Sequence, residues 1–136
     1  MNIKFHPVRG AVLMCDFDTG FRPPEMVKCR PVVILSHRHR EVCTLVPLSG
    51  TEPKPIEACH HEMSPESLPT KFRSEKMWAK CDMVTTVALD RLDRVHEGRN
   101  AATGQRSYFT GCVVDSDLNA IRRCVLHVLG LSHLTF

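Results

Sequence analysis

The sequence of 136 residues contains no long hydrophobic run. No stretch approaches the roughly 20 consecutive apolar residues that a membrane-spanning helix requires. The first residues, Met1 to Pro7, lack the apolar centre of a signal peptide. Internal repeats and low-complexity tracts are absent as well. We therefore expect a single domain over residues 1–136 that stays in the cytoplasm and makes no membrane contact.

The motifs of several large enzyme classes are also missing. The sequence has no Walker loop, no HExxH zinc site, no GxSxG nucleophile turn and no Rossmann fingerprint. Gly10 and Gly20 stand alone, and an isolated glycine does not form a phosphate-binding loop. Composition and motifs by themselves indicate only a globular domain with 43% hydrophobic and 24% charged residues.

Seven cysteines are scattered along the chain, and no two have the CxxC spacing of a zinc knuckle or redox site. Cys15 and Cys43 lie inside apolar runs, where a reduced chain uses cysteine as a small core residue. The cluster Cys59-His60-His61 is the only one that suggests a metal, with His37 and His39 as distant further ligands. Because spacing supplies no second ligand pair, we expect solvated loop histidines, no metal and no other cofactor.

The net charge of +3 comes from the second half of the chain. From position 69 onward there are ten basic and seven acidic residues, whereas the first half has eight of each. This excess is too mild to prove nucleic-acid binding. It is compatible with a polyanionic ligand that local basic clusters hold.

Turn residues divide the first two thirds of the chain into short apolar segments, which is the pattern of a small barrel or sandwich. The segment 31–36, Pro-Val-Val-Ile-Leu-Ser, is too short for a helix and rich in β-branched residues, so it predicts a buried strand. Further strands are expected at 10–17, 42–47, 56–63 and within 76–87. Loops are expected at 21–28, 50–56 and 64–76, and a surface loop or hairpin at 96–107.

The C-terminal segment predicts an amphipathic helix. Ser116 is placed to cap it, and Asp117 lies near its positive end. Gly130 is placed to end it, in a position that commonly needs a left-handed residue. One face is apolar: Leu118, Ile121, Val125, Val128 and Leu129.

Four segments occur in an order that resembles one known family. They are the glycine-led first strand from Gly10 to Phe17, the pair Arg30-Pro31 that opens the second strand, the run Val46-Pro47-Leu48-Ser49, and the block Cys81 to Val87 followed by Leu89-Asp90-Arg91-Leu92. With the closing helix, this order is similar to that of the MazF/PemK toxins. None of these motifs alone is specific to the family. The four motifs in this order, over residues 8–131, are fairly specific to it.

The resemblance implies an α+β, mostly β fold: an SH3-like barrel of the MazF/PemK/CcdB type with a C-terminal amphipathic helix. It implies a toxin that is a metal-independent endoribonuclease, cleaving single-stranded RNA by 2′-hydroxyl attack to leave a 2′,3′-cyclic phosphate and a 5′-hydroxyl. A homodimer is implied, with an RNA groove across two subunits. A cognate acidic antitoxin is implied as the second partner.

The resemblance places the main catalytic arginine at Arg30, its hydroxyl-bearing partner at Ser49 and an active-site carboxylate at Glu25. A guanidinium offers several donors to phosphate oxygens and keeps its charge. A serine hydroxyl adds one hydrogen bond, and a carboxylate near the 2′-hydroxyl acts as a base or positions the substrate. Without the family, each has an ordinary explanation: a solvated strand-start arginine, a turn serine and an exposed loop glutamate.

Other groups are candidates for an RNA groove, although each also suits a plain surface position. They are Lys28, Arg9, Arg38, Arg40, His60 and His61. The aromatic rings of Phe72 and Trp78 are candidates for stacking on bases, with core packing the better expectation for Trp78.

The block around Asp82 departs from the family pattern, in which a glutamine follows the aspartate and several members carry a catalytic basic residue. Here Met83 takes the glutamine position and no arginine is present, so the second acid or base is unidentified, with His60 or His61 as substitutes. Two alternatives stay open. A CcdB-type gyrase poison has the same barrel but acts through a tryptophan-containing C-terminal tail, which this chain lacks. A non-catalytic binding module is compatible with the altered block.

Overall fold

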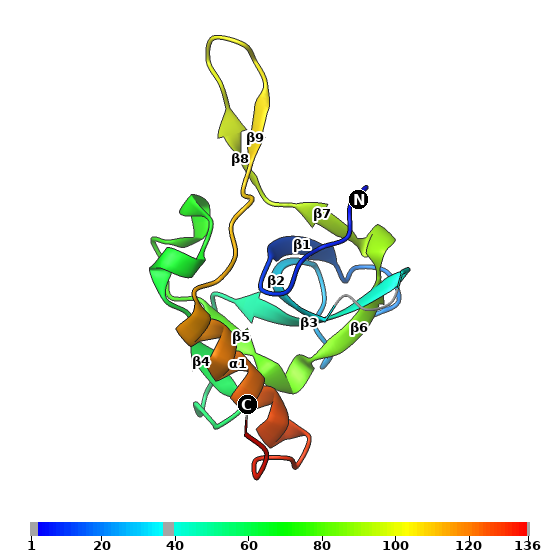
Figure 1. The fold of residues 1–136 in the computed structure, drawn as a ribbon, viewed down its shortest axis with the longest axis vertical. Coiled ribbons are helices and arrows are strands. Elements are labelled where there is room, and N and C mark those ends of the chain that lie inside the picture. Colours follow the sequence, from blue (N-terminus) through cyan, green and yellow to red (C-terminus); the bar gives the residue numbers. More distant parts are fainter. Residues whose placement is uncertain (1–2, 37–39, 136) are drawn as a thin grey trace.

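The computed structural model describes residues 3–36 and 40–135 of the chain. Neighbouring antiparallel strands β1 (Val12–Asp16), β2 (Cys29–Ser36) and β3 (Val42–Ser49) form the centre of its sheet (Figure 1). The other elements are, in chain order, β4 (His60–Glu62), η1 (Pro65–Ser67), η2 (Thr70–Phe72), β5 (Trp78–Lys80), η3 (Cys81–Met83), β6 (Thr85–Ala88), η4 (Leu89–Arg91), β7 (Leu92–Arg94), β8 (His96–Arg99), β9 (Arg106–Tyr108) and α1 (Asp115–Val128). The expected mostly β chain with one C-terminal helix is confirmed.

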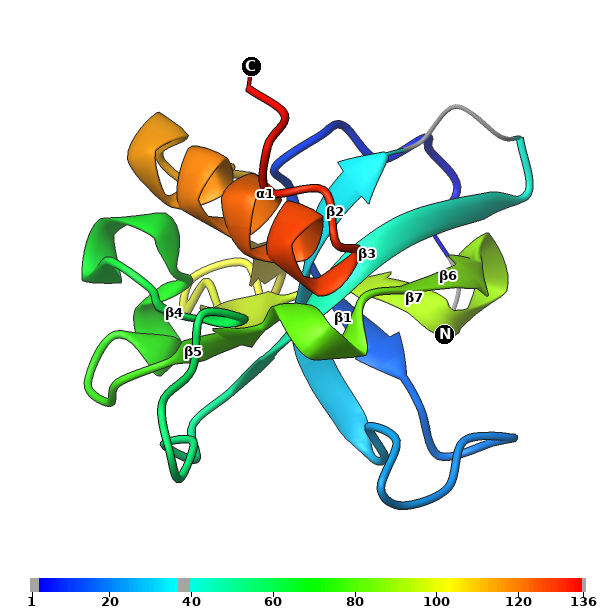
Figure 2. The ribbon, with the colours of Figure 1, turned by 90° about the horizontal axis from the view of Figure 1, so that it is seen from below.

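The main sheet has seven strands, in the order β4-β5-β3-β2-β1-β7, with β6 attached to β3. On β3, residues 42–45 pair with β6, and Leu48 and Ser49 pair with β5. On its other side β3 pairs with β2, with Val32 opposite Pro47. Figure 2 shows α1 lying over one face of the sheet.

Both faces of the central strands are buried, which explains their near-continuous apolar sequence. Val33 and Val46 belong to a cluster that α1 covers through Ile121. Val32 and Ile34 point the other way, into a second cluster. Alternating side chains of one strand therefore serve two cores, as the period of a strand requires.

The two cysteines and the tryptophan that the sequence predicts in the core are buried. Cys15 and Cys43 are 0% and 2% exposed, and Trp78 is 5% exposed. No disulfide links the seven cysteines, all of which lie in the described residues.

The helix begins two residues before the position expected. Val114, and not Ser116, occupies the N-cap position, and Ser116 is exposed in the first turn. The prediction for Ser116 is wrong: the N-cap residue is Val114, which has no capping side chain, and its amide donates to the Oγ atom of Ser67, 47 positions earlier in the chain.

The helix ends as expected. Gly130 has a φ of 74°, and its amide donates to the carbonyl oxygen of His127 while the amide of Leu131 donates to that of Leu126. The apolar face is shorter than predicted, since Val128 and Leu129 are 37% and 58% exposed.

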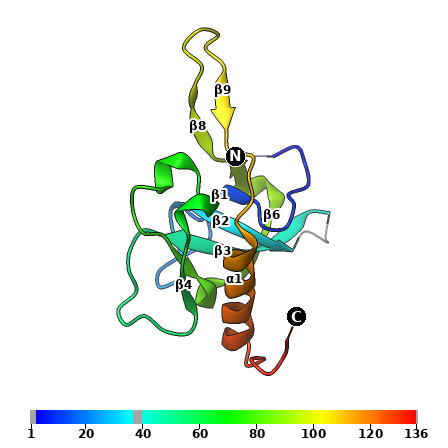
Figure 3. The ribbon, with the colours of Figure 1, turned by 60° about the vertical axis from the view of Figure 1, so that its left-hand side comes forward.

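Two segments far from the sheet centre contribute to the sites that are described below. The expected loop 64–76 contains the short helices η1 and η2, and the expected strand at 56–63 is reduced to β4. Strands β8 and β9 form a two-stranded ribbon that projects from the body, at the opposite end from α1 (Figure 3). Among residues 3–36 and 40–135, no helix has the length and apolarity to cross a bilayer.

Candidate active site

Arg30 lies at the start of β2, opposite Cys15 of β1, and is half-buried. Its Nε atom donates a hydrogen bond to the carbonyl oxygen of Val27, at 3.3 Å. Within the described part of the chain, the guanidinium makes no other hydrogen bond or ion pair. The two Nη groups are therefore available to an anion.

Ser49 is the last residue of β3. Because Val32 lies opposite Pro47, Arg30 and Ser49 each lie two residues further along neighbouring antiparallel strands, at the same end of the sheet and on the same face. The Ser49 side chain is 6% exposed, and its Oγ atom accepts a hydrogen bond from the Thr51 amide at 3.1 Å. The hydroxyl keeps its own proton for donation.

A hollow of about 420 Å³ opens at this end of the sheet, and we call it the Arg30 hollow. Strands β1 to β3 and the turn after Ser49 form one part of it, and the segment before β5 forms the other. Its lining residues are Met14, Cys29, Arg30, Pro31, Leu48, Gly50, Thr51, Phe72, Glu75 and Met77.

Neither Glu75 nor Met77 was predicted from the sequence to line this hollow. Phe72 was predicted only as a residue that could stack on bases. A Cβ atom at Gly50 would lie 3.5 Å from the Glu75 Oε2 atom, so this carboxylate lies against the turn that follows Ser49. Glu75 is the one carboxylate that lines the described hollow. No spacing in the sequence signals the contact, since it joins two loops 25 positions apart.

Glu25 lies in a different place. It lines a second hollow, of about 620 Å³, together with Phe17, Phe21, Pro24, Met26, Asp82, Met83, Val84 and Thr85. Its carboxylate accepts a long hydrogen bond, 3.4 Å, from the Arg22 amide. The structure thus brings Glu25 together with the Asp82 block and leaves Glu75 beside Arg30. Lys28, exposed and with a φ of 72°, lies between the two sites in the sequence.

Two basic candidates, Arg9 and Arg40, lie away from the Arg30 hollow. The Nε atom of Arg9 donates to the Leu35 carbonyl near the other end of β2, and Arg40 is exposed just beyond that end. Eight residues of strand separate the two ends by about 20 Å. Arg38 lies outside the described residues.

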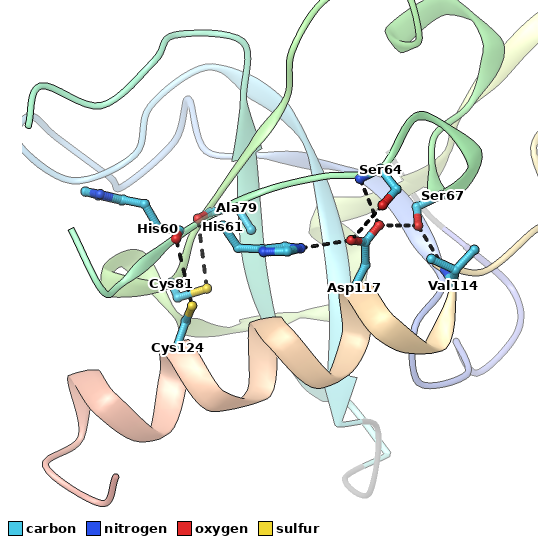
Figure 4. Close-up of polar contacts among 9 residues, drawn as sticks. All are labelled: His60, His61, Ser64, Ser67, Ala79, Cys81, Val114, Asp117 and Cys124. Carbon is cyan, nitrogen blue, oxygen red and sulfur yellow. Dashed lines mark hydrogen bonds and ion pairs between the residues drawn. The ribbon is translucent and has the colours of Figure 1, made fainter. Parts of the chain in front are cut away.

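His61 takes part in a buried network at the start of α1 (Figure 4). Its Nε2 atom lies 2.8 Å from Oδ1 of Asp117, which also accepts hydrogen bonds from the amide and hydroxyl of Ser64 and from the hydroxyl of Ser67. Burial by itself raises the pKa of Asp117, but the hydrogen bonds from Ser67, His61 and Ser64 outweigh burial and hold that pKa below its ordinary value. The network ties β4 and η1 to the helix.

His60 lies beside the Asp82 carboxylate. Donor atoms of Cys59, His60 and Asp82 lie within 4.8 Å of one another, and His60 Nε2 is 3.8 Å from Asp82 Oδ1. The Glu57 amide donates to His60 Nδ1 at 3.0 Å, which leaves the ring proton of a neutral imidazole on Nε2, facing Asp82. A metal at Nε2 would require His60 to give up the bond from Glu57. Sequence spacing missed Asp82 as the third member.

Two thiols meet between η3 and α1, beside this pair (Figure 4). The Cys81 thiol donates to the Ala79 carbonyl oxygen and the Cys124 thiol to that of His60. The contact with Cys81 lowers the pKa of Cys124, against the opposing effect of burial. The same contact, together with burial, raises the pKa of Cys81. Neither thiol lines the Arg30 hollow.

A sequence profile of the PemK-like, MazF-like toxins of type II toxin–antitoxin systems matches residues 8–129. The chain belongs to this family. It is also 30% identical, over 146 aligned positions, to the Escherichia coli K12 protein YifN, and the alignment covers 93% of each chain.

Solved structures with the same fold include proteins of this family. One is described as an endoribonuclease in complex with its cognate antitoxin from mycobacterial species, with a TM-score of 0.62 and 24% identity over 92% of this chain and 96% of that one. The Mycobacterium tuberculosis toxin MazF-mt6 has a TM-score of 0.57 and 16% identity, over 88% and 96%. MazF from Deinococcus radiodurans has a TM-score of 0.64 and 11% identity, over 93% and 99%.

Proposed function

We propose that this chain is the toxin of a toxin–antitoxin pair and that it cleaves single-stranded RNA as a metal-independent endoribonuclease. The observation that carries the proposal is the Arg30 guanidinium, with both Nη groups available, in a hollow lined by Leu48 and Gly50, the two chain neighbours of the buried Ser49. The family and the solved endoribonuclease that shares the fold support it. The family match also favours this activity over gyrase poisoning.

In the proposed reaction, a ribose 2′-oxygen attacks the adjacent phosphorus and the bond to the 5′-oxygen breaks. Arg30 holds the non-bridging phosphate oxygens and stabilises the charge that grows on them. Ser49 donates one further hydrogen bond to the same phosphate. The products are a 2′,3′-cyclic phosphate and a 5′-hydroxyl.

A carboxylate takes the proton of the 2′-hydroxyl. Glu75 is placed for this step because it lines the same hollow as Arg30. Glu25, in the neighbouring hollow with Asp82, positions the nucleotide next to the cut. No second acid lines the described Arg30 hollow, so the leaving 5′-oxygen takes its proton from water.

RNA binding extends beyond these groups. Lys28, exposed two residues before Arg30, contacts a flanking phosphate. Arg9 and Arg40, near the far end of β2, contact RNA or the antitoxin, and Arg38, outside the described residues, is a further candidate for such a contact. We assign no RNA contact to His60 or His61, since Asp82 and Asp117 engage them.

The test is incubation of the purified protein with a long mixed-sequence RNA in the presence of EDTA, followed by analysis of the fragment ends. We expect cleavage that leaves cyclic phosphates and 5′-hydroxyls. Activity that disappears on chelation and returns with a divalent ion would contradict the metal-independent mechanism. Binding of RNA without cleavage under any condition would assign the chain to non-catalytic binding.

A further inference from the structure

The β8–β9 ribbon carries two arginines that face each other. In its antiparallel register, Arg99 lies directly opposite Arg106, and both are exposed. Directly opposite side chains have Cβ atoms about 5 Å apart, and like charges in such a pair repel. Within residues 3–36 and 40–135, neither guanidinium forms an ion pair or a hydrogen bond. The structure holds two unneutralised positive charges side by side.

No nearby carboxylate relieves this repulsion. Glu97 is the one acidic residue between positions 95 and 114. Its Oε1 atom accepts a hydrogen bond from the Thr70 amide at 2.9 Å, which fixes it at the root of the ribbon. An anion from outside the chain is therefore the natural counter-charge for Arg99 and Arg106.

The ribbon is a well-defined support for such a pair. At its tip, the Asn100 amide donates to the carbonyl of Gln105, and the Asn100 side chain accepts from the amides of Ala102 and Thr103. At its root, the Arg94 guanidinium lies 3.9 Å from the centre of the Tyr108 ring. Figures 1 and 3 show the ribbon extending clear of the body.

The root of the ribbon adjoins the Arg30 hollow. Thr70, which bonds Glu97, begins the short helix η2, and Phe72 at the end of η2 lines the hollow. The short helix η2 therefore contacts the root of the ribbon at one end and the Arg30 hollow at the other. A polymer that passes out of the hollow over η2 meets the ribbon next.

The chemistry of the ribbon favours a nucleic acid over a protein partner. Protein interfaces are centred on buried aromatic or aliphatic anchors. The exposed large apolar side chains of the described residues are Phe5, Val8, Ile56, Val128, Leu129 and Leu134, and none lies on the ribbon. Charge with little apolar surface is the signature of backbone phosphate binding.

We propose that the β8–β9 ribbon is a second RNA-binding element, in which Arg99 and Arg106 together hold a backbone phosphate outside the nucleotides bound at the Arg30 hollow. The inference rests on the proposed ribonuclease function. A phosphate between the two guanidiniums accepts forked hydrogen bonds from both and removes their mutual repulsion.

The test compares binding of long and short 2′-O-methyl oligonucleotides, which resist 2′-hydroxyl attack, at a series of salt concentrations. A single binding domain covers about 4–16 nucleotides, so a probe of about 4 reports the hollow alone and one of about 20 reports both sites. The double variant Arg99→Ala, Arg106→Ala should bind the long probe about tenfold more weakly. Its slope of log affinity against log salt should fall by about 0.7 per lost phosphate contact. Binding of the short probe should not change.

The control is Lys4→Ala, Lys54→Ala, which removes two exposed positive charges that lie neither on the ribbon nor among the residues lining the Arg30 hollow. Equal behaviour of the two double variants, while the wild-type chain cleaves RNA, would overturn the ribbon proposal and leave the ribonuclease standing. A wild-type chain that neither binds nor cleaves RNA would overturn both. A selective loss of affinity for polyglutamate would assign the ribbon to an acidic protein partner, and a changed mass in light scattering would assign it to a subunit contact. Either result would also overturn the proposal.

Discussion

His61 Nε2 lies 2.8 Å from Oδ1 of Asp117, so a histidine from β4 closes a shell of donors around a carboxylate in the first turn of α1. Asp117 is 2% exposed and lies where the helix dipole favours a negative charge. In the sequence, Asp117 resembles an ordinary residue of a helix start. In the structure, it connects the helix to β4 and η1.

We predict that Asp117→Asn lowers the free energy of unfolding by about 2–3 kcal/mol, because the charged hydrogen bonds from Ser67, His61 and Ser64 are weakened or lost. Chemical denaturation measures the difference. Asp115→Asn, an exposed neighbour in the same turn, is the control and should change stability little. An equal effect of both variants would contradict the special role of Asp117.

Acid should destabilise the wild-type protein through the same residue. The folded-state pKa of Asp117 is lowered, so its contribution is present above the unfolded value of about 4 and is lost as the pH falls through the folded pKa. Thermal melts between neutral and acidic pH should show this loss, and Asp117→Asn should show a smaller one. Parallel pH profiles of the two proteins would contradict the assignment.

Arg30→Ala should reduce RNA cleavage by at least about a hundredfold, as removal of a key oxyanion donor does. Stability should fall by only about 1 kcal/mol, since the substitution removes one hydrogen bond, to Val27. Ser49→Ala should reduce cleavage by about 10–100-fold, the effect of one or two kcal/mol. Near-full activity in folded Arg30→Ala would show that the site lies elsewhere.

The carboxylates of the two hollows, Glu75 and Glu25, should have different effects on kcat and KM. Glu75→Gln is expected to lower kcat with little change in KM, because it removes the proton acceptor in the Arg30 hollow. Glu25→Gln should raise KM with little change in kcat. The reverse pattern would move the base to the hollow that Glu25 shares with Asp82.

The antitoxin should compete with RNA at the start of β2. We expect an acidic, partly disordered segment that binds more weakly as salt rises. Lys28→Glu should weaken both ligands together, because one positive charge attracts phosphate and carboxylate alike. Loss of RNA binding with unchanged antitoxin affinity and salt dependence would contradict a shared surface.

A homodimer is expected, since a domain this small buries little surface alone. Light scattering at micromolar concentration measures the mass. A monomer with intact cleavage activity would show that one chain completes the site.

Local sequence patterns predicted the central strands well. The run of β-branched residues at 32–34 is short and bounded by turns, and a strand buried on both faces requires such a run. Arg30 and Ser49 could be named as candidate site residues from the strand order and the family resemblance. The rest depends on contacts between distant segments: the hydrogen bond from Val114 to Ser67, the place of Glu75 in the wall of the Arg30 hollow and the pairing of His60 with Asp82. No periodicity encodes these contacts.

Residues 64–77 touch three regions at once. Ser67 bonds Asp117 and Val114 of the helix, Thr70 bonds Glu97 of the ribbon, and Phe72 and Glu75 line the hollow. A chimera that exchanges this segment with a relative would therefore transplant a helix cap, a ribbon anchor and a substrate wall as one unit. Such exchanges should carry the partners Glu97 and Asp117 along with the segment, or the recipient will lose two of the three connections.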